Sequence, residues 1–182
     1  IYLELNVATA DSLVSSDVPI FDPDAWRLTS QQQELCERVR VLGAQNFAGR
    51  ASRYDREASF PTENYKDLHS SGLLGICIPE SCGGIGADLK TYMLAAAEMG
   101  RYCGATALTF NMHVSSCLWT GFLADTLDMS EHVRKEHQTA RMLHYQRVLE
   151  DGAIYAQPFS EGGAAAAGAK AFGTKAVITD GG

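Results

Sequence analysis

Residues 29–54 carry the first clear helical pattern in the chain. Small or apolar residues recur at steps of three and four, which places them on one side of a helix: Leu35, Cys36, Val39, Leu42, Gly43 and Phe47. Thr29 followed by Gln32 matches a capping box, in which each side chain bonds to the backbone N–H of the other residue. We therefore expect a helix that begins at Thr29 and fades between Arg50 and Tyr54.

Residues 61–79 predict a shorter helix followed by a connector. Pro61 is suited to the start of this helix, and Gly72 stands where a left-handed residue commonly ends one. Residues 73–79 are apolar, but the run is short and ends at a proline. We expect a connector that packs on the core.

Three further helices are predicted between residues 88 and 152. Asp88 is a suitable cap for a helix that runs to Gly100 with these apolar positions: Leu89, Tyr92, Met93, Ala96 and Met99. Residues 105–123 have apolar side chains in almost every direction, which is typical of a central helix enclosed by others: Leu108, Phe110, Met112, Val114, Leu118, Trp119 and Phe122. Ser130 opens a polar helix that ends at Asp151-Gly152.

The pattern changes after Gly152 from helical to extended. Residues 153–157 and the alternating residues 172–179 are strand candidates, and an isolated pair of strands is only marginally stable in water. We therefore expect a mainly α-helical domain followed by the first strands of an incomplete β-domain. The predicted organisation is an extension over 1–28, a helical domain over 29–152 and the start of a β-domain over 153–182.

Composition and charge exclude several classes of protein. Hydrophobic residues make up 46% of the chain and charged residues 20%, the mix of a globular protein. A net charge of -7 argues against a nucleic-acid or anionic-membrane partner, because binding phosphate requires clustered positive charge. No apolar run approaches the roughly 20 residues of a membrane span, and no signal peptide opens the chain, so we expect a cytoplasmic protein.

Most of the individual motifs do not indicate a catalytic or metal-binding site. The five cysteines are odd in number and irregularly spaced, which favours buried reduced thiols over disulfides or a metal site. Gly84-Ile85-Gly86 begins like a dinucleotide fingerprint, but Leu89 stands where the third glycine belongs. His137 and His144 share a helix face without further ligands at metal spacing, and no serine lies in a G-x-S-x-G motif.

The segment from Ser160 to Gly168 allows two interpretations. Its glycines and alanines are compatible with a low-complexity surface loop. Small residues also allow backbone N–H groups to approach an anionic or planar cofactor closely, and Ser160 would add a hydroxyl donor.

The order of the motifs is more specific than any one of them. From about Ser30 to Gly182 the chain resembles the first half of an acyl-CoA dehydrogenase, with these matching motifs in sequence: Tyr54-Asp55, Phe60-Pro61, Ser71 to Ile76, Pro79 to Gly86, Ala97 to Gly100, Gly152 to Gly163 and Gly173 to Ala176. The resemblance implies a helical N-terminal domain, a middle β-barrel-like domain and a C-terminal four-helix domain, of which only the first and the start of the second are expected in this chain.

The resemblance also implies a cofactor, a reaction and partners. Members of this family use FAD to convert an acyl-CoA thioester to the 2-enoyl-CoA in fatty acid metabolism: a glutamate takes the α-proton and the flavin accepts a hydride. That glutamate is expected beyond Gly182, so no catalytic base is named. An electron-transfer flavoprotein or similar acceptor and a homotetrameric assembly are expected.

Site residues follow from the same resemblance. Cofactor-binding residues are expected at Tyr155, Phe159 and Ser160, beside the flavin ring, and within Gly163 to Ala166, at the pyrophosphate. Here Gly163 and Ala166 offer only backbone N–H groups. The helix that lines the acyl channel in relatives carries the candidate substrate-lining residues Leu108, Phe110, Asn111 and Met112.

Two alternatives to a dehydrogenase remain at this point. A flavin-dependent monooxygenase has the same fold and uses reduced flavin and oxygen. A catalytically inactive relative that only binds ligand would have lost its base.

Overall fold

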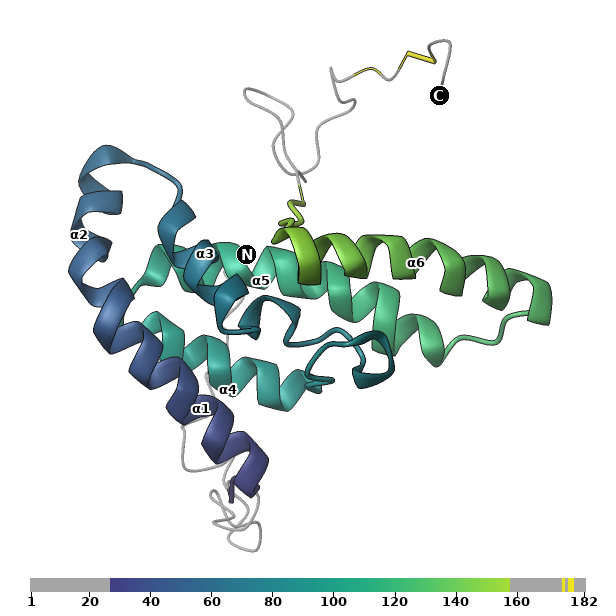
Figure 1. The fold of residues 1–182 in the computed structure, drawn as a ribbon, viewed down its shortest axis with the longest axis horizontal. Helices are drawn as coiled ribbons and strands as arrows, with labels where there is room; N and C mark the ends of the chain where they lie inside the picture. Colours follow the sequence, from purple (N-terminus) through teal and green to yellow (C-terminus); the bar gives the residue numbers. More distant parts are fainter. Residues whose placement is uncertain (1–26, 158–174, 176, 179–182) are drawn as a thin grey trace, which may run out of the picture.

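The computed structural model describes residues 27–157, 175, 177 and 178, and within them the fold is mainly helical (Figure 1). Its elements in chain order are α1 (Ser30–Leu42), η2 (Gly43–Phe47), α2 (Ala48–Glu57), α3 (Thr62–Ser70), η3 (Leu73–Gly75), η4 (Glu80–Cys82), α4 (Leu89–Gly100), α5 (Gly104–Leu118), η5 (Trp119–Leu123) and α6 (Glu131–Asp151). η2 and η5 are π-helical turns, and η3 and η4 are 3₁₀ turns. The helical domain is confirmed.

The β-domain is not seen in the described residues. Residues 153–157, expected as a strand, run without strand pairing, because no neighbouring strand is present among the described residues. The second expected strand falls almost entirely outside them, as does nearly all of the extension over 1–28.

α1, η2 and α2 form one continuous helical run. The capping box is confirmed: Thr29 Oγ1 accepts from the Gln32 N–H at 3.2 Å, and Gln32 Oε1 accepts from the Thr29 N–H at 3.1 Å. The run ends at Glu57, beyond the predicted end. Contacts with α3 hold this end of the run, since the Arg50 guanidinium pairs with Asp67 at 2.5 Å and bonds to Asn64 at 3.0 Å.

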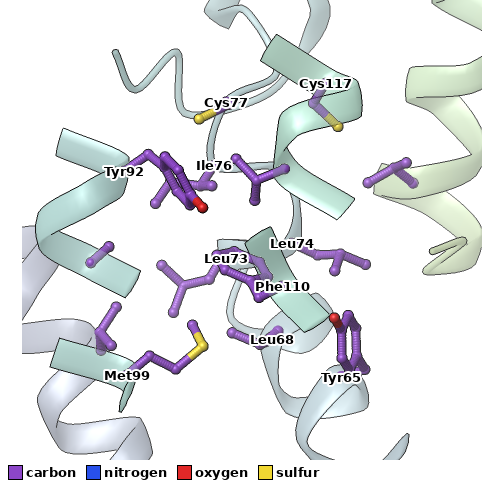
Figure 2. Close-up of a cluster of buried hydrophobic side chains, with 14 of the residues drawn as sticks. Tyr65, Leu68, Leu73, Leu74, Ile76, Cys77, Tyr92, Met99, Phe110 and Cys117 are labelled. Carbon is purple, nitrogen blue, oxygen red and sulfur yellow. The ribbon is translucent and has the colours of Figure 1, made fainter. Parts of the chain in front are cut away.

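The connector Leu73–Ile78 is completely buried, as predicted. Gly72 precedes it with a φ of 75°, the left-handed conformation that the sequence predicts there. Figure 2 shows Leu73, Leu74 and Ile76 of the connector within the main cluster of buried side chains, beside Leu68 and Phe110. The centre of this helical domain is therefore an irregular segment whose backbone polar groups need partners away from water.

The glycine-rich loop after the connector supplies many of those partners. The Gly86 N–H donates to the Ile78 carbonyl and the Ala87 N–H to the Ile76 carbonyl, each at 2.8 Å. A Cβ on Gly84 would lie 2.2 Å from the Ile78 carbonyl oxygen. The glycines thus allow two backbones to pack closely, which agrees with the rejection of a dinucleotide fingerprint.

α4 begins as predicted but buries a different face. The Asp88 carboxylate accepts from the Thr91 N–H at 2.8 Å, which caps the helix. The Thr91 hydroxyl and then this N–H lower the pKa of Asp88. Leu89 and Met93 were expected in the core and are exposed, while Ala95 is fully buried. The prediction was wrong at these two positions because α1 and α5 pack on the opposite side of α4.

α5 is central but not enclosed, contrary to the prediction. Its inner face is buried, whereas Leu108, Trp119 and Phe122 are 66%, 51% and 62% exposed. Among the described residues, neighbouring elements cover only one side of α5 and η5. The all-round apolar pattern therefore reflects a core face and a second apolar face that is uncovered here.

α6 lies alongside the end of α5 and bonds to the π-helical turn η5 (Figure 1). Ser130 caps α6 and Gly152 ends it at a φ of 68°, both as predicted. The Thr120 carbonyl of η5 accepts from Arg141 Nη1 at 3.1 Å and from His137 Nε2 at 2.9 Å. Arg141 is only 5% exposed, and its charge is paired with Asp125 at 2.8 Å.

The cysteines are free thiols, three of them in the core. All five cysteines are free thiols, and Cys77, Cys103 and Cys117 are buried. Burial raises the pKa of Cys77 and of Cys117 to about 12, so both are inert thiols at neutral pH. No helix in the described part of the chain has the length and apolar character that crossing a membrane requires.

We predict opposite effects of two glycine-to-alanine substitutions. Gly84→Ala should lower the free energy of unfolding by about 2 kcal/mol, because the new Cβ forces the loop away from the connector. Gly49→Ala is the control: a methyl group added to Gly49, within α2, meets no neighbouring residue within 4 Å, so the variant should gain up to about 1 kcal/mol. Urea denaturation of both variants tests this, and an equal loss in both would contradict the packing described here.

Candidate functional site

The four predicted substrate-lining residues of α5 point in different directions. Phe110 is 0% exposed and belongs to the core, whereas Leu108 lies on the uncovered face. Asn111 Oδ1 accepts a hydrogen bond from the Tyr92 hydroxyl, and Met112 is 37% exposed. Successive residues of a helix are rotated by about 100°, so four neighbours cannot share one wall. Of the four, only Met112 reaches the hollow described below.

Residues 153–157 return from the end of α6 across the surface of α5. The Tyr155 N–H donates to Nδ1 of His113 at 3.0 Å. Two residues later, the Gln157 side-chain amide lies 2.7 Å from Ser115 Oγ and 3.0 Å from Ser116 Oγ. The segment is therefore attached to α5 at two points.

The ring of Tyr155 lies between α5 and α6. It stacks on the His113 ring with centroids 5.8 Å apart and planes at 16°, and it meets the His144 ring edge-on at 6.1 Å. Burial raises the pKa of Tyr155 to about 12, so its phenol is neutral. The backbone N–H of Tyr155 is already engaged, because it donates to His113.

Met112 and Tyr155 meet at one hollow, which we call the Met112 hollow. It has a volume of about 450 Å³ and these lining residues: Phe60, Tyr65, Thr109, Met112, Ile154, Tyr155, Ala156 and Gln157. None of these side chains is charged at neutral pH, and most are apolar. The hollow is suited to an uncharged, mainly apolar group and not to a phosphate.

A second hollow lies between the beginnings of α1 and α4. It has a volume of about 430 Å³, and Gln32, Arg38 and Asp88 are among its lining residues. Two of its polar groups are engaged within the protein: Gln32 bonds to Thr91 at 3.1 Å and Arg38 to the Ser71 carbonyl at 2.7 Å. None of the predicted site residues lines it.

Tyr65 is the most unusual polar group beside the Met112 hollow. Its hydroxyl is buried and has no hydrogen-bond partner among the described residues. Burial raises its pKa to about 12, with the nearby Thr109 hydroxyl opposing that rise, and Thr109 itself donates to the Ala105 carbonyl at 2.9 Å. Figure 2 shows the Tyr65 hydroxyl directed toward the helix that carries Phe110.

The remaining predicted cofactor residues lie outside the described residues: Phe159, Ser160, Gly163 and Ala166. Within the described ones, no three His, Cys, Asp or Glu side chains are arranged to bind a metal ion. His137 bonds to the Thr120 carbonyl and His144 packs against Tyr155.

The sequence interpretation missed His113, Tyr65 and Gln157. A histidine at an inward-facing position of an apolar helix is the signal that marks His113 as a buried hydrogen-bonding group. Tyr65 falls on the buried face of α3, where a hydroxyl needs a partner. Gln157 has no comparable signal, because its partners are serines about 40 positions earlier.

The fold and its sequence define a protein class. The pattern described as "Acyl-CoA dehydrogenase, N-terminal domain" matches residues 29–125, which is more than half of the chain. The chain belongs to the acyl-CoA dehydrogenase family.

Curated relatives agree with this assignment. A probable acyl-CoA dehydrogenase, YngJ of Bacillus subtilis, is 37% identical over 90 residues, which cover 50% of this chain and 24% of the relative. A short-chain specific acyl-CoA dehydrogenase of Clostridium acetobutylicum is 30% identical over 50% of this chain and 24% of its own. The human mitochondrial short-chain specific enzyme is 30% identical over 54% and 26%. The matched part of the chain thus spans about a quarter of these relatives.

A solved structure shows the same fold. The X-ray structure of KijD3 in complex with dTDP has a TM-score of 0.59 and 24% sequence identity, and covers 70% of this chain and 31% of its own. At this identity the likeness supports the helical fold alone.

We predict that removing the hydroxyl from two buried tyrosines changes the free energy of unfolding in opposite directions. Tyr65→Phe should raise the free energy of unfolding by about 1 kcal/mol, because it removes a buried hydroxyl without a partner among the described residues. Tyr145→Phe is the control: its hydroxyl lies 3.1 Å from Thr120 Oγ1 and donates to the Cys117 carbonyl at 3.4 Å, so its loss should cost about 1 kcal/mol. Equal destabilisation of both variants, measured by chemical denaturation, would show that Tyr65 has a partner in solution.

Proposed function

We propose that the chain is the N-terminal part of a longer, FAD-dependent enzyme that oxidises an acyl-CoA thioester to the 2-enoyl-CoA. The observation that carries the proposal is membership of the acyl-CoA dehydrogenase family over residues 29–125. The names of the relatives support the same substrate class, since each is an acyl-CoA dehydrogenase.

The Met112 hollow is the proposed contact for the acyl chain. Its uncharged walls favour burial of methylene groups, each worth about 0.8 kcal/mol. Met112 is unbranched and adapts to chains of different shape. Phe110 supports this wall from behind, within the core, and Leu108 lies outside it. Asn111 does not line the hollow, and its side chain accepts a hydrogen bond from the Tyr92 hydroxyl.

FAD would be bound by the residues after the described segment. The chemistry that flavin would supply when bound is acceptance of a hydride from the β-carbon of the acyl group. Phe159 and Ser160 are proposed at the ring, and Gly163 and Ala166 at the pyrophosphate. Tyr155 is proposed to contribute through its packing, since its N–H donates to His113 and its ring lies between helices. Its role is to support the cofactor segment from the protein side.

Other parts of the reaction belong to the rest of the protein. The general base is assigned to no residue of this chain. An electron-transfer flavoprotein or similar acceptor, and assembly as a homotetramer, complete the proposal. The described residues bind the acyl chain of the substrate, exclude water beside α5 and orient the segment that leads to the cofactor.

Anaerobic titration of the full-length protein tests the function. With a panel of acyl-CoAs of increasing chain length, at least one should bleach the oxidised-flavin absorbance and yield the 2-enoyl product, because a dehydrogenase reduces its flavin from the thioester itself.

Each alternative has a distinct result in the same titration. No bleaching, together with oxygen-dependent product once reduced flavin is supplied, would identify a monooxygenase. No bleaching and no oxygenation would identify a binding protein.

Met112 should determine acyl-chain length. Met112→Trp fills the Met112 hollow and should lower kcat/KM by about four-fold for each methylene excluded, with shorter acyl-CoAs affected least. Leu108→Trp is the matched control, since Leu108 is one turn away on α5 but does not line the hollow. Identical chain-length profiles for the two variants would place the acyl chain elsewhere.

A further inference from the structure

We propose that His113, together with Gln157, is a positioning residue that sets the register of residues 153–157 on α5, and through it the placement of the flavin-facing residues beyond them. This inference rests on the proposed function. It assigns a role to a histidine whose position in the core excludes direct contact with substrate or flavin.

Both ring nitrogens of His113 are in use. Nε2 lies 2.9 Å from the Leu74 carbonyl and can only donate there, while Nδ1 accepts from the Tyr155 N–H at 3.0 Å. One protonation state satisfies both bonds: the neutral ring with its proton on Nε2. Burial favours this state, because it lowers the pKa of His113. The imidazole thus joins the buried connector to the cofactor-side segment.

Stacking of the Tyr155 ring on the His113 ring also fixes the orientation of Tyr155. The rings of His113 and Tyr155 are nearly parallel, and Phe110 also packs against the imidazole, with centroids 6.2 Å apart. The Tyr155 backbone and side chain are therefore both fixed against the same group. His113 is 0% exposed, so the whole arrangement is anchored in the core.

Gln157 provides the second point of attachment. Its amide donates to Ser115 and Ser116, one turn along α5 from Met112, whose carbonyl lies 3.1 Å away. Two attachments two residues apart fix the register of residues 153–157 on α5. If this segment is treated as extended chain, a slip by one residue would turn Tyr155 to the opposite face and shift the segment by about 3.4 Å.

Such a shift exceeds the tolerance of a hydrogen bond. Donors and acceptors meet within about 2.7 to 3.2 Å, so a displacement of about 3.4 Å loses a bond completely. Phe159 and Ser160 come two and three positions after Gln157. The attachment at His113 therefore controls how well these residues meet the flavin ring without touching it.

Two substitutions of His113 separate its two bonds. The amide of Asn lies near the place of Nδ1, so His113→Asn keeps an acceptor for Tyr155 and loses the Leu74 bond. The longer Gln places its amide near Nε2, so His113→Gln keeps the Leu74 bond and loses the Tyr155 bond. Each variant loses one buried hydrogen bond. If His113 only stabilised the fold, both variants should therefore change FAD affinity equally.

The experiment uses full-length protein and two readouts. FAD affinity, measured by flavin fluorescence, should fall by a few-fold to about ten-fold in His113→Gln and stay near the wild-type value in His113→Asn. Hydrogen exchange over residues 153–157, followed by mass spectrometry, should accelerate in His113→Gln alone.

The outcomes distinguish this inference from the proposed function. Equal FAD affinity and equal exchange in the two variants would overturn the inference and leave the function standing, whereas wild-type protein that takes up no FAD would overturn both. If the His113 variants do not fold, Gln157→Met replaces them, since it removes the other attachment at the surface. It should weaken FAD binding and accelerate exchange, and no change in either would overturn the inference.

Discussion

The structure depends on a constraint at its centre: a segment without regular secondary structure is buried among helices. Burying a peptide group without a hydrogen-bond partner costs about 1–3 kcal/mol, so the connector Leu73–Ile78 requires partners from elsewhere in the chain. The glycine-rich loop provides N–H donors to Ile76 and Ile78, and His113 provides one to Leu74. The helices can pack as they do only because these bonds form together.

The same constraint links the core to the candidate site. His113 satisfies the Leu74 carbonyl with one nitrogen and holds the Tyr155 N–H with the other. The wall of the Met112 hollow formed by residues 154–157 is thus attached to the most deeply buried part of the domain. A hollow built this way keeps its shape because one wall cannot move without opening a bond in the core.

Local chemistry explains which features the sequence could predict. Caps at Thr29, Asp88 and Ser130 and the left-handed glycines at 72 and 152 depend on neighbouring residues only, and all five are found where expected. The family could likewise be inferred from an ordered set of motifs. Its helical domain is confirmed, and the β-domain stays a prediction.

Features that depend on distant contacts were less predictable. The apolar spacing in α4 gave no indication that Met93 would be exposed, because periodicity identifies a stripe but not the neighbours that cover it. In the candidate site, Met112, predicted to line the substrate channel, and Tyr155, predicted to bind the cofactor, both line the Met112 hollow, and both roles stay predictions. The hydrogen bonds of His113 and Gln157 join residues about 40 positions apart, beyond the range of any local pattern.

The π-helical turn η5 has a consequence for how this domain can evolve. Such a turn contains one residue more than the α-helix needs over the same rise, and here it presents the Thr120 carbonyl to Arg141 and His137. Deleting a single residue between Trp119 and Leu123 would restore a regular helix but rotate the residues after the deletion by about 100°. Arg141 would then be left as a buried charge facing the wrong partner. The stretch is therefore intolerant of insertions and deletions, and relatives should keep its length.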